Sequence, residues 1–365
     1  MNICLIGDSL TSLALAKNLI NKNIKVFLYY RKSKNSSNQS RTIGISKNNF
    51  DFFNNEIIKF KKDMFWKIRK IEIYSEKLKD EKILNFENNE NELFLTAKNN
   101  EIYQLLEKDL KKKKLFKKIL IKNSNFYKKI LNEKKYELII NCDGNNKIFK
   151  NFFFNKLHKS YNSFAYTTII NHQNIKNEKA IQIFTKIGPI AFLPISNFKT
   201  SVVFSIINME KVLKEDEIKK LIQTYNKNYE IKSFGKLEKF KLNFTIPRNY
   251  YYKNLMAFGD SLHRIHPLAG QGFNMTLRDI NILSKIIQDR IDLGLDIDPS
   301  ICELFEKKTK HLNFIFSTGN DFIYEFFKFS GKNNNNYLSQ LIKFLGKNKL
   351  FTRVASKYAD QGLYI

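Results

Sequence analysis

Residues 259–274 read GDSLHRIHPLAGQGFN and are the most informative part of this chain. An acid, Asp260, then a proline and two glycines come directly before a predicted helix that begins at about Asn274. A carboxylate can accept hydrogen bonds from ligand hydroxyls, and glycine lets the backbone approach a flat ring because no Cβ intervenes. The N–H groups at a helix start favour a ligand that becomes anionic. The stretch therefore predicts a site for a flat ligand that bears hydroxyl groups and acquires negative charge.

This stretch resembles the signature of the FAD-dependent aromatic hydroxylases, and within them of the ubiquinone-biosynthesis hydroxylases. That signature reads Gly-Asp-Ala-Ala-His, then His-Pro, then Gly-Gln-Gly-x-Asn. The resemblance implies that Asp260 holds the ribityl chain of FAD and that Pro267 brings backbone near the isoalloxazine ring. The residues implied to offer N–H groups to the pyrimidine edge of the ring are Gly270, Gly272, Phe273 and Asn274.

His263 and His266 lie inside the same stretch. Histidine titrates near neutral pH and is a common acid or base. The family's mechanism needs no histidine base, so the resemblance implies that both residues pack or form hydrogen bonds. We therefore predict no catalytic side chain. We also predict no metal site, because no other cluster of metal-ligating residues accompanies the two histidines.

The N-terminus predicts a βαβ unit. Two apolar runs, Ile3–Ile6 and Ile24–Leu28, flank a segment with helical spacing, which is typical of parallel strands joined by a helix. The turn at Gly7–Ser12 corresponds to the dinucleotide fingerprint, which has glycine at its first, third and sixth positions. An ordinary strand-turn-helix would look the same, but the family also starts this way.

The fingerprint is incomplete in this chain. Gly7 remains, whereas Ser9 and Ser12 occupy the other two glycine positions. The second strand ends in Tyr29 and Tyr30, where an acid would receive the ribose hydroxyls. Ser9 still allows close backbone approach and can donate to a phosphate. We expect the affinity for FAD to be reduced by these changes.

Three further segments resemble parts of the same family. Arg41 begins the segment RTIGIS, whose arginine lies against the cofactor in the family; the alternative is an arginine at a strand edge in a surface ion pair. Asp143 and Gly144 follow a predicted strand and resemble the pair near the FAD pyrophosphate and the nicotinamide; the alternative is a plain turn. Residues 188–194 resemble a segment of the family's substrate sheet.

Together with the resemblance, the pattern of the rest of the chain implies an α/β protein: a Rossmann-like FAD-binding domain built from discontinuous segments, with an inserted β-rich substrate domain. The spacing predicts helices over Phe50–Phe65 and Glu101–Lys118, and strands dominate residues 161–204. The predicted domains are 1–66, 92–160 and 249–330 for FAD, 67–91 and 161–248 for substrate, and 331–365 as a C-terminal helical tail.

The charge of the chain indicates which classes of partner it can bind. Lys and Arg number 63 against 35 Asp and Glu, a formal net charge of +28, yet only eight of the basic residues are Arg. Proteins that recognise nucleic acid depend on arginine for paired hydrogen bonds, and arginine is scarce here. We therefore predict no nucleic-acid partner and favour an anionic membrane surface. The three scattered cysteines indicate a reduced, intracellular protein. We see no secretory leader and no membrane-spanning run.

The resemblance implies an enzyme. NADH or NADPH would reduce FAD, and the flavin would use dioxygen to hydroxylate a polyprenylated phenol on the route to ubiquinone. We therefore expect a lipophilic aromatic substrate, a cytoplasmic enzyme peripheral to the inner face of the cell membrane, and other ubiquinone-biosynthesis enzymes as partners. Two alternatives stay open: an aromatic hydroxylase with a soluble substrate, and a degenerate scaffold that binds FAD weakly or not at all.

Overall fold

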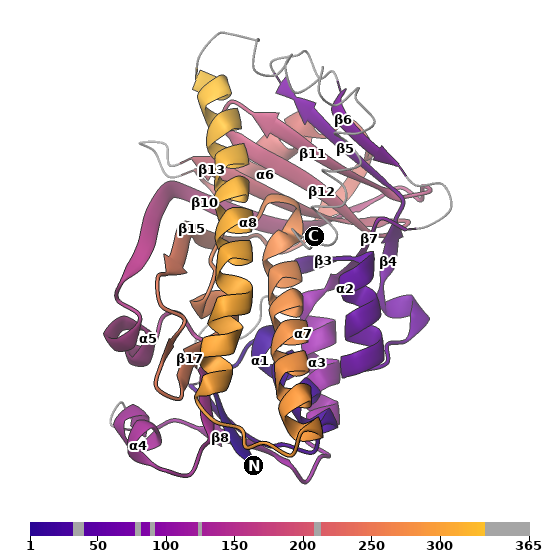
Figure 1. The fold of residues 1–365 in the computed structure, drawn as a ribbon. Helices are drawn as coiled ribbons and strands as arrows, with labels where there is room; N and C mark the ends of the chain where they lie inside the picture. The colour runs from indigo at the N-terminus through magenta and orange to yellow at the C-terminus, as the bar shows by residue number, and fades with distance from the viewer. Residues whose placement is uncertain (32–39, 77–81, 88–91, 123–125, 208–212, 333–365) are drawn as a thin grey trace.

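The computed structural model describes residues 1–31, 40–76, 82–87, 92–122, 126–207 and 213–332. The described part is the predicted α/β fold, with three sheets and two long helices that run side by side past them (Figure 1). The predicted C-terminal tail at 331–365 lies outside the described residues, except for Gly331 and Lys332 at the end of the last helix.

The first sheet contains the predicted βαβ unit, which is confirmed. Its strand order is β16-β17-β9-β1-β2-β8, and every neighbouring pair is parallel except β16 with β17. The strands are β1 (Asn2–Ile6), β2 (Lys25–Tyr30), β8 (Phe116–Leu120), β9 (Leu138–Asn141), β16 (Tyr251–Tyr252) and β17 (Leu255–Ala257), and the helices packed near them include α1 (Leu10–Asn21) and α3 (Asn99–Leu110). The carboxyl ends of the parallel strands therefore meet at one edge, where ligands bind in such folds.

The second sheet is large and almost entirely antiparallel, as the β-prone middle of the chain predicts. It has eight strands in the order β14-β10-β13-β12-β11-β5-β6, with β15 also pairing with β10. They are β5 (Lys70–Ser75), β6 (Lys82–Glu87), β10 (Lys156–His172), β11 (Lys179–Thr185), β12 (Gly188–Ser196), β13 (Lys199–Ile207), β14 (Ile231–Phe234) and β15 (Glu238–Pro247). Residues of β10 alternate between the two faces: Tyr166 packs on the side of α6 (Glu215–Tyr225), and Tyr161 packs on the other side.

A small third sheet, β3-β7-β4, lies between these two (Figure 1). Its antiparallel strands are β3 (Thr42–Ser46), β4 (Trp66–Ile68) and β7 (Phe94–Lys98). The shorter helices are α2 (Lys47–Phe52), which continues as a π-turn over Phe53–Ile57, the 3-10 turn Lys62–Met64, α4 (Phe126–Asn132) and α5 (Lys147–Phe152).

Two predicted helices end earlier than their spacing indicated. The helix predicted over Glu101–Lys118 stops at Leu110, and Phe116–Leu120 forms β8. Spacing alone missed this strand because its parallel partner, β2, lies far away in sequence. The helix predicted over Phe50–Phe65 ends at Ile57, since the chain turns there towards β4.

The helices α7 (Gln271–Asp292) and α8 (Ser300–Lys332) pack against each other in the centre of Figure 1. Helix α7 begins three residues before the predicted Asn274, because Gly270 adopts a left-handed conformation (φ +66°) that lets the chain enter the helix directly. Helix α8 contacts β16 of the first sheet and β11 of the second, so it bridges the two sheets.

Candidate functional site

The turn between β1 and α1 holds three predicted site residues. Gly7 has a φ of +118°, which side-chain-bearing residues rarely adopt. Ser9 is the N-cap of α1: its Oγ accepts the Ser12 N–H at 3.3 Å and lies 3.1 Å from the Ser12 Oγ, and Ser12 is fully buried. Of the two serines that replace fingerprint glycines, Ser9 therefore caps the helix and Ser12 supplies the N–H that is capped.

Asp143 and Gly144 follow β9 and lie beside both neighbouring motifs. A Cβ added to Gly7 would lie 3.2 Å from the Asp143 Cβ, and a Cβ added to Gly144 would lie 3.0 Å from the carbonyl oxygen of Asp260. Both distances are shorter than most contacts of a real Cβ atom, so a side chain at Gly7 or Gly144 would push on its neighbours. The structure thus brings together the motifs that follow β1, β9 and β17.

Asn141, which sequence reasoning missed, organises this junction from the end of β9. Its Nδ2 donates to the Asp143 carbonyl at 3.1 Å, and its Oδ1 accepts the Asn146 Nδ2 at 2.6 Å. Its carbonyl accepts the Phe258 N–H at 2.9 Å. No local signal distinguishes this asparagine from any polar residue that ends an apolar run.

A second junction joins the start of α7 to β3. The side chain of Asn274 is fully buried; its Oδ1 accepts the Ser46 N–H at 3.0 Å, and its Nδ2 donates to the Gly44 carbonyl at 3.0 Å. A Cβ added to Gly270 would lie 3.4 Å from the Gly44 nitrogen. The Asn274 amide therefore anchors the helix start within the protein, which leaves its backbone as the part that can face a ligand.

Gly272, Phe273 and Pro267 complete the predicted contacts at this helix start. Gly272 faces open space. Apart from its chain neighbours and its own helix backbone, no described atom would lie within 4 Å of a Cβ added there. The Phe273 ring packs 5.8 Å from the Phe53 ring, at the edge of the core. Pro267 is half-buried and precedes the 3-10 turn Leu268–Gly270.

Asp260 and Arg41 are the two exposed charged residues of the predicted set. Among the described residues, neither the Asp260 carboxylate nor the Arg41 guanidinium makes a hydrogen bond or an ion pair. The surface ion pair considered for Arg41 is thus not found within that part of the chain. Both groups are free to contact a ligand.

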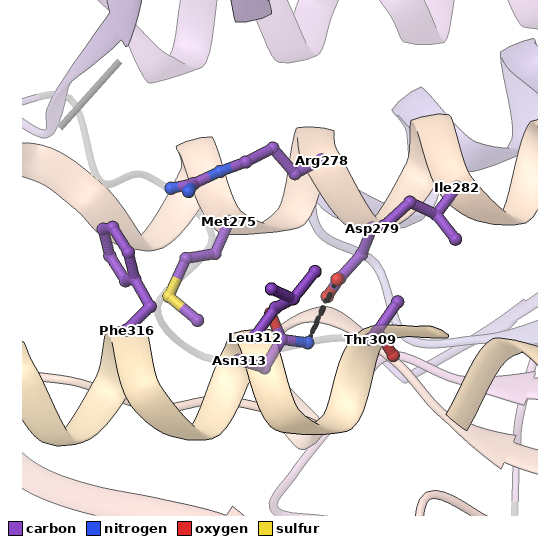
Figure 2. Close-up of a pocket in the computed structure, with 8 residues that line it drawn as sticks. All are labelled: Met275, Arg278, Asp279, Ile282, Thr309, Leu312, Asn313 and Phe316. Carbon is purple, nitrogen blue, oxygen red and sulfur yellow. Dashed lines mark hydrogen bonds between the residues drawn. The ribbon is translucent and has the colours of Figure 1, made fainter. Parts of the chain in front are cut away.

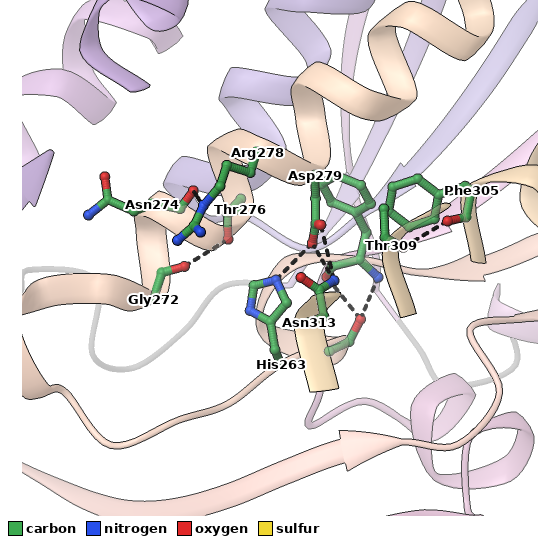
Figure 3. A network of polar contacts seen from close by, with 11 residues as sticks. His263, Gly272, Asn274, Thr276, Arg278, Asp279, Phe305, Thr309 and Asn313 are labelled. Carbon is green, nitrogen blue, oxygen red and sulfur yellow. Dashed lines mark hydrogen bonds and ion pairs between the residues drawn. The ribbon is translucent and has the colours of Figure 1, made fainter. Parts of the chain in front are cut away.

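A buried polar network ties residues 259–274 to α7 and α8 (Figure 3). His263 Nε2 lies 2.8 Å from Asp279 Oδ2, and Asn313 Nδ2 donates to Asp279 Oδ1 at 3.1 Å. The side chains of His263 and Asp279 are 1% and 2% exposed, so this contact is shielded from water. Sequence reasoning missed Asp279 and Asn313, because a polar residue on a buried helix face has the same spacing as one on a surface face.

His266 has a different environment. Its ring stacks on Tyr324 with centroids 4.1 Å apart and meets Tyr161 edge-on at 5.2 Å. Burial lowers the pKa of His266 to about 3, so the ring is neutral at physiological pH. Both histidines have the packing or hydrogen-bonding environments that were expected.

A small pocket lies between α7 and α8 (Figure 2). It is lined by Met275, Arg278, Asp279, Ile282, Thr309, Leu312, Asn313 and Phe316. None of the residues predicted to bind FAD lines it, so it is separate from the junctions described above.

The residues around the two junctions are compatible with FAD. Gly7 and Gly144 allow the motifs to pack closely, and Gly272 faces open space where a flat ring could approach the backbone. Helix α7 begins after a glycine, whose lack of a side chain leaves its first turn without a side-chain cap. The Gln271 N–H donates to the Leu268 carbonyl, and the N–H groups that follow it can face an electron-rich ring. The exposed Asp260 carboxylate lies on the same loop.

Solved structures with the same fold are FAD-dependent monooxygenases. PqsL of Pseudomonas aeruginosa, described as a probable FAD-dependent monooxygenase, matches with a TM-score of 0.70 and 10% identity over 94% of this chain and 99% of its own. The p-nitrophenol 4-monooxygenase PnpA of Pseudomonas putida matches with a TM-score of 0.75 and 10% identity over 99% and 98%. The predicted fold class is thereby confirmed.

Curated relatives are ubiquinone-biosynthesis enzymes, in agreement with the resemblance stated above. The ubiquinone biosynthesis monooxygenase COQ6 of Caenorhabditis elegans is 28% identical over 38% of this chain and 40% of its own length. Ubiquinone hydroxylase UbiL of Rhodospirillum rubrum is 25% identical over 37% and 33%. The 3-demethoxyubiquinol 3-hydroxylase of Escherichia coli is 27% identical over 42% and 40%. The chain thus spans about two fifths or less of the length of these relatives.

A family model covers a longer part of the chain than any of these three alignments. The squalene epoxidase model matches residues 135–353, which is more than half of the sequence and includes both Asp143-Gly144 and the whole of 259–274. The chain therefore belongs to the squalene epoxidase family.

Proposed function

We propose that this protein is an FAD-dependent monooxygenase that hydroxylates the aromatic ring of a polyprenylated phenol in ubiquinone biosynthesis, using NAD(P)H and dioxygen. The observation that carries the proposal is the convergence of Gly7, Asp143-Gly144 and residues 259–274 at the carboxyl ends of β1, β9 and β17. The ubiquinone-biosynthesis relatives support the substrate class.

Bound FAD would supply the redox chemistry with dioxygen, and the residues of this chain would bind and orient it. Asp260 would accept hydrogen bonds from the ribityl hydroxyls. The first N–H groups of α7 would stabilise negative charge on the reduced ring, because they lie at the positive end of the helix dipole. Burial lowers the pKa of His266 to about 3, which makes it a weak base, and the His263 Nε2 is engaged by Asp279, so neither histidine is proposed as a base.

We also propose the division into segments stated above: 1–66, 92–160 and 249–330 for FAD, and 67–91 and 161–248 for substrate. All strands of the β16-β17-β9-β1-β2-β8 sheet fall within the first group. The large sheet falls almost wholly within the second, apart from the first residues of β10. The interface between the two sheets, which α8 bridges, is where we place the aromatic substrate.

We propose further that the protein works at an anionic membrane surface on the inner face of the cell membrane, where a polyprenylated substrate and other ubiquinone-biosynthesis enzymes would be met. Among the described residues, no helix is long and apolar enough to cross a bilayer. Helix α8 instead exposes a set of large apolar side chains: Phe314, Ile315, Phe322, Ile323 and Phe329. Together with the net charge of +28, this apolar face favours adsorption to acidic lipid.

Binding to liposomes tests the membrane proposal. Flotation with vesicles containing phosphatidylglycerol should carry the protein, and Phe322→Ser with Phe329→Ser should reduce the bound fraction several-fold. Phe198→Ser, which alters an exposed phenylalanine on the β12–β13 turn, should have no effect. Equal loss in both variants would contradict a role for α8.

A second candidate is a scaffold that binds FAD weakly or not at all. It is favoured by Tyr30 at the end of β2, where the fingerprint has an acid, and by the serines at positions 9 and 12. The absorbance spectrum of the purified protein separates the two candidates. Flavin bands, and NAD(P)H oxidation that rises when membrane extract is added, would support the hydroxylase. A colourless protein that ignores added FAD would support the scaffold.

A further inference from the structure

The end of β2 lacks the acid that normally binds the adenosine ribose of a dinucleotide. Tyr30 ends the strand and is paired in register with Leu120 of β8. The ammonium of Lys118, also on β8, lies 4.6 Å from the centre of the Tyr30 ring. A tyrosine under a lysine cannot accept two ribose hydroxyls as a carboxylate would, so this strand end does not supply the usual contact.

An acid lies at the neighbouring strand end. Asp8 follows Gly7 directly after β1, and its Oδ1 accepts the Tyr103 hydroxyl at 2.6 Å and lies 3.0 Å from the Lys118 Nζ. Its side chain is 22% exposed, and its Oδ2 has no hydrogen-bond partner among the described residues. One carboxylate oxygen is therefore held in place while the other remains open to a ligand.

The two groups that hold Asp8 are themselves fixed. Lys118 also contacts Glu107 at 2.6 Å and the Tyr103 hydroxyl at 3.1 Å, and its side chain is 13% exposed. Burial acts to lower the pKa of Lys118, but its bonds to Glu107, Tyr103 and Asp8 outweigh this and raise the pKa, so the lysine stays charged. Burial and Asp8 raise the pKa of Tyr103, which keeps its hydroxyl as a donor. The direction of the Asp8 carboxylate is thus set by two partners that are themselves held by other contacts.

We propose that Asp8 receives the ribose hydroxyls of the adenosine half of FAD, in place of the acid absent from position 30, with Tyr103 and Lys118 as positioning residues. Because β1 and β2 are parallel neighbours, an acid moved from the end of one to the end of the other stays at the same edge of the sheet. This inference rests on the proposed function, since it assumes that FAD binds.

Comparison of two flavins tests the proposal, because FMN has no adenosine. Flavin-stripped protein is titrated with FAD and with FMN, and binding is followed by quenching of flavin fluorescence. Asp8→Asn should weaken FAD binding about tenfold or more and leave FMN binding unchanged, as expected for loss of a charged hydrogen-bond acceptor. Asp63→Asn, at an exposed acid in the turn before β4, is the matched control and should change neither. Adding Tyr30→Glu to Asp8→Asn should recover part of the FAD affinity.

The outcomes separate this inference from the proposed function. If Asp8→Asn binds FAD as well as the unmodified protein or better, or if it loses FAD and FMN equally, the assignment of Asp8 is wrong while the flavoenzyme proposal stands. If the unmodified protein binds neither flavin, the proposed function fails and the inference fails with it. Circular dichroism of each variant establishes that it has folded.

Discussion

Two helices of this protein start beside the same candidate site, and their first turns are built differently. Helix α1 begins after Ser9, whose hydroxyl caps the Ser12 N–H. Helix α7 begins after Gly270, which has no side chain, and the buried Asn274 amide anchors it to β3. At the start of α7 the Gln271 N–H donates to the backbone carbonyl of Leu268, and no side chain of the N-cap residue takes the N–H groups that follow. At the start of α1 a side chain, that of Ser9, takes the Ser12 N–H.

The difference follows from burial. Changing one member of the network around α7 would leave buried partners unsatisfied, which is costly, so its residues can change only together. The α1 turn is partly exposed, and a serine that replaces glycine there satisfies itself locally. This contrast explains how residues 259–274 can keep the family signature while the fingerprint at 7–12 has lost two glycines.

The largest effect is expected at the buried pair behind α7. Asp279→Ala would leave His263 and Asn313 without their acceptor, and we expect the free energy of unfolding to fall by about 3 kcal/mol. Urea unfolding measures this. Asp292→Ala, at an exposed acid on the same helix, should change stability by less than about 0.5 kcal/mol. A similar small change for Asp279→Ala would show that the network does not anchor α7.

The pH dependence of stability should show the burial of His266. Its pKa of about 3 in the folded protein lies below the ordinary value of 6.5, so between these values only the unfolded chain binds the proton. Stability should therefore fall as the pH drops below about 6.5, by about 2 kcal/mol at pH 5 from this residue. His266→Phe should remove that part of the loss, as measured by urea unfolding at pH 7 and pH 5.

Tyr324→Phe is the control for His266, because it keeps the stacked ring and does not alter the histidine. Its loss of stability between pH 7 and pH 5 should equal that of the unmodified protein. If His266→Phe also retains the full loss, the histidine is not buried in its neutral form.

How far the sequence predicts this site depends on whether the contacts are local. The glycines and acids of 259–274 and Asp143-Gly144 could be found because each motif is a short run that follows a strand. Asp279 and Asn313 could not, since they meet across two helices and their spacing also suits an exposed face. Helical spacing continues into the strand β8, and the contact of its Lys118 with Asp8 cannot be predicted from the sequence either, because the two residues lie far apart along the chain.

Two glycines have different surroundings: Gly144 is packed against backbone, whereas Gly272 faces the space proposed for the flavin ring. Gly144→Ala would push a Cβ against the Asp260 carbonyl, and we expect a loss of about 1.5 kcal/mol in unfolding free energy. Gly272→Ala would meet no described neighbour, so stability should be unchanged or slightly raised, while FAD affinity falls about tenfold because the methyl group enters the space proposed for the ring. Thermal unfolding and flavin titration check both. If Gly272→Ala bound FAD as tightly as the unmodified protein, the proposal that the flavin ring binds at the start of α7 would be wrong.

Among the variants expected to lose stability, the smallest loss is expected at the cap of α1. Ser9→Ala removes the hydroxyl that accepts the Ser12 N–H and should cost about 1 kcal/mol, whereas Ser9→Gly should cost only a few tenths, because glycine tolerates an open helix start. Ser9→Gly also restores glycine at the third position of the fingerprint and frees the N–H of Ser12 for a phosphate, so its affinity for FAD should rise several-fold. Ser9→Ala lacks the backbone freedom of glycine, so its gain in FAD affinity should be smaller. Urea unfolding and FAD titration measure the two quantities on the same samples. If Ser9→Gly binds FAD more weakly than the unmodified protein, the serine hydroxyl itself is a ligand contact, and the start of α1 is adapted to FAD and not eroded.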